Sequence, residues 1–152
     1  MVKLIEGFGE KLRSIILFGS IASGRMRPES DIDLLIIAEN LPENYSERLK
    51  LLRRMTVGIE EEAIRLWREK KIYPLIDPII LTPEEASRIQ PFYLDLLENS
   101  IIIYDKDRFM ESVLEELKGR LERLRSRKVL LLNGSWYWIV KPNAKAGEVI
   151  EV

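Results

Sequence analysis

Residues 15–38 read IILFGSIASGRMRPESDIDLLIIA, and this stretch decides how the chain folds. Its two apolar runs, Ile15–Phe18 and Leu34–Ala38, have the length and composition of buried strands. A Gly-Ser pair closes the first run, whereas Asp31 and Asp33 stand at the start of the second. Carboxylates at the mouth of an apolar core are costly unless they have a partner, so the two aspartates call for an explanation.

The composition fits a single folded domain and excludes several kinds of chemistry. The chain has 152 residues, of which 46% are hydrophobic and 32% charged, enough to form a real core. The absence of cysteine suits a cytoplasmic protein, and the absence of histidine excludes Ser-His-Asp triads and His-ligated zinc. A net charge of -1 argues against nucleic acid as the partner, and no apolar run reaches the roughly 18 residues of a membrane span.

Apolar periodicity predicts helices and strands that alternate along the chain. We expect strands over residues 14–18, 31–38, 72–81 and 100–104, and helices over 2–13, 20–27 (a short helix or a turn), 46–71, 83–98 and 107–127. Gly58 is expected to break the third helix, Pro91 to restart the fourth, and Thr82-Pro83-Glu84-Glu85 to open that fourth helix with a capping box. The fold class is therefore α/β (α+β), a small mixed sheet flanked by helices, with a C-terminal helix and aromatic tail.

The domain organisation predicted from these elements is a core over residues 1–105, with residues 106–152 packed on the same domain. The tail is expected to form a hairpin that turns at Asn133-Gly134 and places Trp136 and Trp138 on one face. Packing on the domain or on a partner explains those tryptophans better than stacking on a nucleobase. Trp67, in the predicted helix 46–71, is likewise expected to pack against the core.

Gly19-Ser20 has the features of a phosphate-binding turn. Glycine lets the backbone turn sharply and approach a ligand, and the N–H groups that follow point toward an anion. The signal alone is weak, because no Gly-Lys-Ser/Thr follows as it would in a P-loop. A plain structural turn with capping aspartates is the alternative.

The acidic residues strengthen the interpretation as a site. Asp31 and Asp33 face the same side of a strand, roughly 6–7 Å apart, where two carboxylates would repel each other unless a cation lay between them. Oxygen ligands favour Mg²⁺ or Mn²⁺. Asp77, in the apolar run before Pro78, is the candidate third member if its strand is a neighbour, and it would then help to deprotonate an acceptor hydroxyl. Its alternative role is to stabilise a turn before Pro78. A phosphate cradle beside an acidic metal site favours phosphoryl or nucleotidyl transfer.

The spacing of these residues resembles a known signature. Gly19-Ser20, ten residues and then Asp31-Ile32-Asp33 is similar to the GS-x10-D-x-D pattern of the DNA polymerase beta-like nucleotidyltransferase superfamily. The stretch from Ser30 to Leu35 is similar to the S-D-[IV]-D-[LV] core of its minimal nucleotidyltransferases. The resemblance covers about residues 14–105. It implies a small mixed sheet, two divalent metals, and transfer of a nucleoside monophosphate, such as AMP from ATP, to a hydroxyl.

The same resemblance implies roles for individual residues. Gly19 and Ser20 would hold the β- and γ-phosphates of the nucleoside triphosphate, Asp31 and Asp33 the metals, and Asp77 would be the third carboxylate. Many minimal members are encoded beside a HEPN-domain protein as toxin–antitoxin pairs and can add AMP to the toxin. A HEPN-type partner and protein adenylyltransferase activity are thus what the resemblance implies.

One departure from the family pattern concerns the residues after Gly19-Ser20. The family often has Ala-Arg-Gly there, whereas this chain has Ala22-Ser23-Gly24. Arg25 and Arg27 are the candidates to replace the missing charge. Two other functions remain open: an inactive antitoxin or scaffold that acts by binding alone, and a nucleotidyltransferase for small molecules. The sequence also leaves open whether the chain associates with copies of itself.

Overall fold

The computed structural model describes residues 1–72, 75–132, 136–145 and 147–150. Four strands form a mixed sheet in the order β3-β2-β1-β4, and β5 pairs with β6 in a separate hairpin. The strands are β1 (Leu12–Phe18), β2 (Ile32–Ala38), β3 (Ile76–Leu81), β4 (Ile101–Asp105), β5 (Arg127–Leu130) and β6 (Trp136–Ile139). The helices are α1 (Val2–Phe8), α2 (Gly19–Ala22), α3 (Tyr45–Met55), α4 (Ile59–Lys70), α5 (Pro83–Ala86), α6 (Tyr93–Leu96) and α7 (Phe109–Arg123), with 3-10 turns η1 (Gly9–Lys11) and η2 (Lys106–Arg108).

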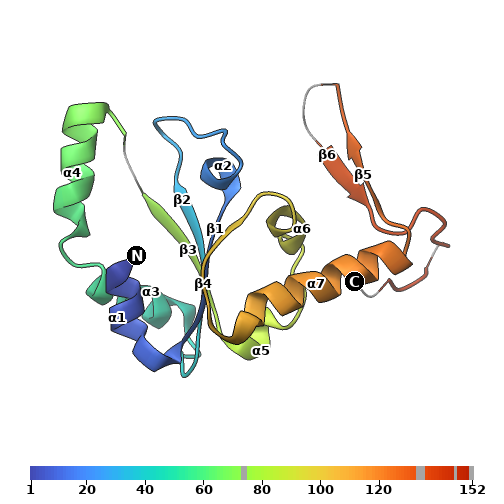
Figure 1. Cartoon of the computed structure of the whole chain (residues 1–152), viewed down its shortest axis with the longest axis horizontal. Helices are drawn as coiled ribbons and strands as arrows, with labels where there is room; N and C mark the ends of the chain where they lie inside the picture. Colours follow the sequence, from blue (N-terminus) through green and yellow to red (C-terminus); the bar gives the residue numbers. More distant parts are fainter. Residues whose placement is uncertain (73–74, 133–135, 146, 151–152) are drawn as a thin grey trace.

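The sheet combines antiparallel and parallel pairing. β1 runs antiparallel to both β2 and β4, whereas β2 and β3 are parallel and are joined through α3 and α4. α1 and α3 cover one face of the sheet, and α5, α6 and α7 cover the other (Figure 1). The predicted mixed α/β fold is confirmed.

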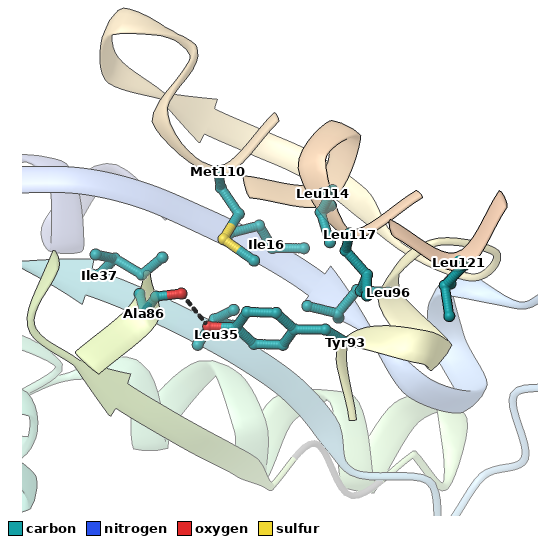
Figure 2. Close-up of a cluster of buried hydrophobic side chains, with 10 residues drawn as sticks. All are labelled: Ile16, Leu35, Ile37, Ala86, Tyr93, Leu96, Met110, Leu114, Leu117 and Leu121. Carbon is teal, nitrogen blue, oxygen red and sulfur yellow. Dashed lines mark hydrogen bonds between the residues drawn. The ribbon is translucent and has the colours of Figure 1, made fainter. Parts of the chain in front are cut away.

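Each face of the sheet contributes to its own buried cluster, because side chains alternate along the central strands. On the α7 side, Ile16, Leu35 and Ile37 pack with residues of α5, α6 and α7. Figure 2 shows this cluster, in which the buried Tyr93 hydroxyl donates to the carbonyl of Ala86 at 2.9 Å. On the other side, Leu34, Ile36 and Ala38 pack against α1 and α3. The apolar run at the end of the opening stretch is therefore buried from both sides.

The start of α5 follows the sequence prediction closely. The Thr82 hydroxyl accepts from the Glu85 N–H at 3.2 Å, and the Glu85 carboxylate accepts from the Thr82 N–H at 2.9 Å. This is the predicted capping box, with Pro83 in the first helical turn. The predicted break at Gly58 is also confirmed, since this residue adopts a left-handed backbone between α3 and α4.

Several predictions about helices were wrong in part, and so was the predicted packing of Trp67. The helix predicted over 83–98 is instead two single turns, α5 and α6, and the short helix or turn predicted over 20–27 is helical only to Ala22. The helix predicted over 2–13 ends at Phe8, because Gly9 takes a φ of 54° and Leu12 already belongs to β1. The helix predicted over 107–127 begins at Phe109, since Asp107 and Arg108 both have positive φ, and it ends at Arg123 before β5. Trp67 does not pack in the core: it is 49% exposed on α4.

The C-terminal hairpin extends from the end of α7 (Figure 1). Trp138 and Val140 pack against the cluster that α7 builds, and Lys128 pairs with Glu98 beside α6. The Lys128 ammonium also lies 4.4 Å from the ring centre of Trp136. The predicted turn at Asn133-Gly134 lies outside the described residues. In the described part of the chain, no helix is long and apolar enough to cross a membrane.

Candidate active site

The junction between β1 and α2 requires a glycine. Gly19 has a φ of +73°, a conformation that side chains other than glycine adopt at a cost. A Cβ atom at this position would lie 1.9 Å from Oδ2 of Asp33, on the neighbouring strand. Gly19 therefore allows the turn and also leaves room for the Asp33 carboxylate.

Sheet pairing brings the three predicted carboxylates to one place. Asp33 pairs with Phe18 across the antiparallel ladder and with Asp77 across the parallel one. Asp33 and Asp77 thus point to the same face of the sheet, and Asp31, two residues earlier, lies just outside β2. The N–H of Ile32 donates to the carbonyl of Leu75 at 2.7 Å, which fixes the two segments against each other.

The three carboxylates also interact electrostatically. Partial burial raises the pKa of Asp33 above its usual value, and the negative charges of Asp77 and Asp31 raise it further. Asp31 and Asp77 themselves are exposed. A pKa raised by burial and like charge indicates a carboxylate that would be stabilised by a cation.

The donor set fits a divalent cation, although the side chains are not yet arranged around one. Among the described residues, no group of three or more acidic side chains is placed so that it could hold a metal ion as it stands. Exposed aspartates such as Asp31 and Asp77 change rotamer at small cost. Carboxylate oxygens from two adjacent strands are the ligands that Mg²⁺ and Mn²⁺ prefer.

α2 contributes less to a phosphate site than the sequence suggested. It spans four residues, too short to build a substantial helix dipole. A feature that the sequence did not reveal lies at its end. The Ser23 hydroxyl donates to the carbonyl of Ser20 at 3.1 Å, and Nε of Arg25 donates to the Ser23 hydroxyl at 3.1 Å. Ser23 thus holds the guanidinium of Arg25 beside this turn.

Side chains from α6 and the hairpin reach the same end of the molecule. The rings of Phe18 and Phe92 stack with centres 5.9 Å apart. Burial raises the pKa of Asp95, while the positive charges of Lys128 and Arg25 oppose that effect. Lys128 of the hairpin and Arg25 of the loop after α2 therefore both act electrostatically on Asp95 of α6. No sequence pattern indicated this, because the three residues come from segments far apart in the chain.

Two hollows in the surface differ in whether they adjoin these carboxylates. One, of about 350 Å³, lies between α3 and β3 and is lined by Tyr45, Leu49, Leu52, Arg53, Thr56, Ile76, Asp77 and Pro78. A groove of about 680 Å³ lies where β1 begins and β2 ends, lined by residues that include Arg13, Glu39 and Asp107 and none of the three predicted carboxylates. Of the two, only the smaller hollow adjoins the candidate site.

Comparison with known proteins defines the class to which this site belongs. The family described as Polymerase beta, Nucleotidyltransferase matches residues 3–109. The chain is also 37% identical over 126 residues to the "Putative protein adenylyltransferase MJ1305" of Methanocaldococcus jannaschii, covering 81% of this chain and 79% of that protein. The chain belongs to the polymerase beta-like nucleotidyltransferases and resembles their minimal members; it is an enzyme of that kind.

One solved structure shows the same fold at low identity, and a second aligns less well. A mutant of the toxin–antitoxin MntA-HpeT aligns with a TM-score of 0.50 and 17% identity, over 82% of this chain and 86% of the other. A toxin–antitoxin with AMP-PNP aligns with a TM-score of 0.49 and 16% identity, over 82% and 89% of the two chains.

Proposed function

We propose that this nucleotidyltransferase moves AMP from ATP to a hydroxyl of a partner protein, a HEPN-type toxin for which it is the antitoxin. The observation that carries the proposal is the meeting of Asp31, Asp33 and Asp77 beside the turn at Gly19. Family membership supports nucleotidyl transfer, and the name of the archaeal relative supports a protein as acceptor. The shared fold with toxin–antitoxin proteins is consistent with such a partner.

The proposed reaction is a displacement at the α-phosphorus of ATP. The acceptor oxygen forms a bond to that phosphorus, the bond to the bridging oxygen between the α- and β-phosphates breaks, and pyrophosphate leaves. Asp77, on the outer strand, takes the proton of the acceptor hydroxyl. The backbone of Gly19 and Ser20 holds the β- and γ-phosphates, and Arg25 adds positive charge at the same turn.

A divalent cation, Mg²⁺ or Mn²⁺, would neutralise phosphate charge when bound. Asp31 and Asp33 are the residues that would hold it, with Asp77 completing the set. Without a cation, Asp33 carries an unfavourable charge, as its raised pKa indicates.

The experiment that tests this proposal uses ATP labelled at the α-phosphate, Mg²⁺, the protein and a lysate of its source organism. We expect one labelled protein band, whose mass identifies the acceptor. The Asp31→Asn/Asp33→Asn double variant is the control and should give no band.

Other results would separate the alternatives. Label in a small molecule, and in no protein, would contradict the protein acceptor and support small-molecule transfer. Failure to bind ATP at all, with Mg²⁺ present, would contradict the enzymatic proposal and favour an antitoxin that acts by binding alone.

A further inference from the structure

The chemistry of nucleotidyl transfer sets the direction from which the acceptor must arrive. The bond that forms and the bond that breaks lie in line, on opposite sides of the α-phosphorus. In the proposed reaction, Gly19 and Ser20 hold the leaving pyrophosphate at the end of β1, and β2 separates β1 from β3. The acceptor hydroxyl therefore approaches from the outer edge of β3, where Asp77 would take its proton.

From Pro78 onward, the outer edge of β3 is occupied by side chains of α3. The Tyr45 hydroxyl donates to the carbonyl of Pro78, and the Arg48 guanidinium donates to the carbonyl of Ile80. Pro78 also lacks an N–H group. An incoming chain is therefore directed to the start of β3, immediately before Asp77.

A hollow of about 350 Å³ lies at this place, between α3 and β3. Ile76 and Pro78 line it from the strand, and Leu49 and Leu52 line it from the helix. These four apolar side chains suit an apolar side chain of the incoming chain. Asp77 belongs to the same lining, so a residue held in the hollow lies close to the candidate site.

The hollow and Asp77 use different faces of the sheet. Ile79 and Leu81, which alternate in step with Asp77, pack in the cluster on the α7 side, whereas Ile76 packs in the cluster on the α3 side. Successive side chains of an extended chain also point to opposite sides. An extended segment that passes the edge of β3 can thus direct its hydroxyl toward Asp77 and the neighbouring side chain into the hollow.

Arg53 gives the hollow a positive charge. This arginine is exposed, and within the described part of the chain its guanidinium makes no ion pair or hydrogen bond. The hydroxyls of Tyr45 and Thr56, in the same lining, already donate to the carbonyls of Pro78 and Leu52. An incoming carboxylate would therefore find the guanidinium of Arg53 available for a charge-assisted hydrogen bond.

We propose, on the basis of the proposed function, that this hollow recognises the acceptor segment of the partner protein. That segment is extended, with an apolar residue next to the acceptor hydroxyl and an acidic residue close by. The apolar side chain enters the hollow, and the acidic side chain pairs with Arg53. Arg53 is thus a specificity-determining residue that positions the acceptor without touching the reacting atoms.

The first test repeats the labelling assay with Arg53→Glu over a range of lysate concentrations. We expect the lysate concentration for half-maximal labelling of the acceptor band to rise roughly tenfold or more, because an attraction becomes a repulsion. The maximal rate and the ATP concentration for half-maximal labelling should stay close to the wild-type values. Arg54→Glu, at the next exposed arginine of α3 and outside the lining of the hollow, is the matched control and should label as wild type does. Thermal melting of both variants reports whether each still folds.

The second test examines the acceptor itself. Mass spectrometry of the labelled band locates the modified hydroxyl, and we expect an acidic residue within about three positions of it, a span of roughly 10 Å in an extended chain. Replacing that acidic residue of the acceptor by arginine should weaken transfer by the wild-type enzyme and restore transfer by Arg53→Glu.

The possible outcomes separate this recognition from the proposed function. Labelling by Arg53→Glu at the wild-type lysate concentration, or a modified hydroxyl with no acidic residue near it, would overturn the recognition alone. A rise in the half-maximal ATP concentration instead would overturn it too, and would assign the hollow to the nucleotide. Absence of labelling by the wild-type protein would overturn the proposed function and the recognition with it.

Discussion

β3 and β4 are both outer strands of one sheet, yet their edges differ in nearly every respect. Two side chains of α3 bind the outer backbone of β3: the Tyr45 hydroxyl donates to the carbonyl of Pro78 at 2.8 Å, and the Arg48 guanidinium donates to the carbonyl of Ile80 at 3.0 Å. Pro78 itself lacks an N–H group. β4 carries three exposed isoleucines instead.

The difference places the candidate site and the exposed isoleucines at opposite edges of the sheet. Two carbonyls of β3 are occupied by side chains of α3, and β3 presents Asp77 next to Asp33. β4 keeps an apolar edge, which a bulge at Ile103 interrupts.

The buried guanidinium of Arg48 helps to hold the outer edge of β3. Arg48 is only 5% exposed and bonds to the carbonyls of Pro42 and Ile80. It also makes a two-point contact with the Glu85 carboxylate, at 2.6 and 2.9 Å. Because Glu85 completes the capping box of α5, a single network joins α3, β3 and α5.

The largest effect should follow from neutralising Asp33, which lies on β2 and pairs with Asp77 of β3. Asp33→Asn is expected to lower the rate of AMP transfer at least about 100-fold, because the cation and the phosphates lose a ligand and a charge partner. Incorporation of α-labelled ATP into the acceptor measures this rate. Ile101→Asn, on β4, is the control and should leave the rate per protomer unchanged. An equal loss in both variants would mean that the two edges are not separate in function.

Substitutions at Gly19 and Gly24 separate the effect of backbone strain from the effect of displacing Asp33. Gly19→Ala places a Cβ 1.9 Å from the Asp33 carboxylate, whereas Gly24→Ala meets nothing within 4 Å at a similar φ of +70°. Both substitutions cost about 1–2 kcal/mol of backbone strain. Only Gly19→Ala should also lose transfer activity, by about tenfold or more, since it displaces Asp33. Chemical denaturation and the labelling assay measure the two effects, and similar activities for both variants would contradict the role given to Gly19.

Removing the Arg48 side chain should destabilise the folded protein. Arg48→Ala is expected to lower the free energy of unfolding by about 3 kcal/mol, because it leaves Glu85 and two backbone carbonyls without their partner. Arg53→Ala, at an exposed arginine of the same helix, should change the free energy of unfolding by less than about 0.5 kcal/mol. Urea denaturation measures both. Equal effects would show that Arg48 does not stabilise the edge.

The smallest expected effect is on the pH dependence of stability, to which Glu85 and Asp33 contribute with opposite signs. Hydrogen bonding to Arg48 lowers the pKa of Glu85, so its contribution to stability is present above the usual carboxyl pKa and is lost as the pH falls through the lowered value. The pKa of Asp33 is raised, so its charge lowers stability above that raised value, and this cost disappears at acid pH.

Melting curves of two variants test this sign difference. In metal-free buffer at neutral pH, Asp33→Asn should melt at the wild-type temperature or above it, and the two should converge at acid pH. Glu85→Gln should melt below wild type at neutral pH and approach it at acid pH. A sharp drop in the melting temperature of Asp33→Asn at neutral pH would identify Asp33 as a structural residue.

Local patterns explain which parts of the fold were predictable. The buried runs of residues 15–38, the break at Gly58 and the capping box at Thr82 depend on neighbouring residues, and each was foreseen. The burial of Arg48 and the exposure of Trp67 depend on which segments pack together, which a single sequence does not reveal. The end of the first helix at Gly9 was missed because apolar spacing continues into β1.

The candidate site was predictable to a similar degree. The spacing of Gly19, Asp31 and Asp33 pointed to it, but the place of Asp77 required the parallel pairing of β2 and β3. The link from Ser20 through Ser23 to Arg25 had no local signal, since its geometry arises only in the folded turn.

The most direct test of the central claim is the binding of Mn²⁺, followed by electron paramagnetic resonance, in the presence of a non-hydrolysable ATP analogue. We predict that wild-type protein binds the cation and that Asp31→Asn/Asp33→Asn loses this binding. Asp107→Asn, at an aspartate outside the candidate site, should bind as wild type does. Unchanged binding in the double variant would contradict the assignment of these carboxylates to a nucleotidyl-transfer site.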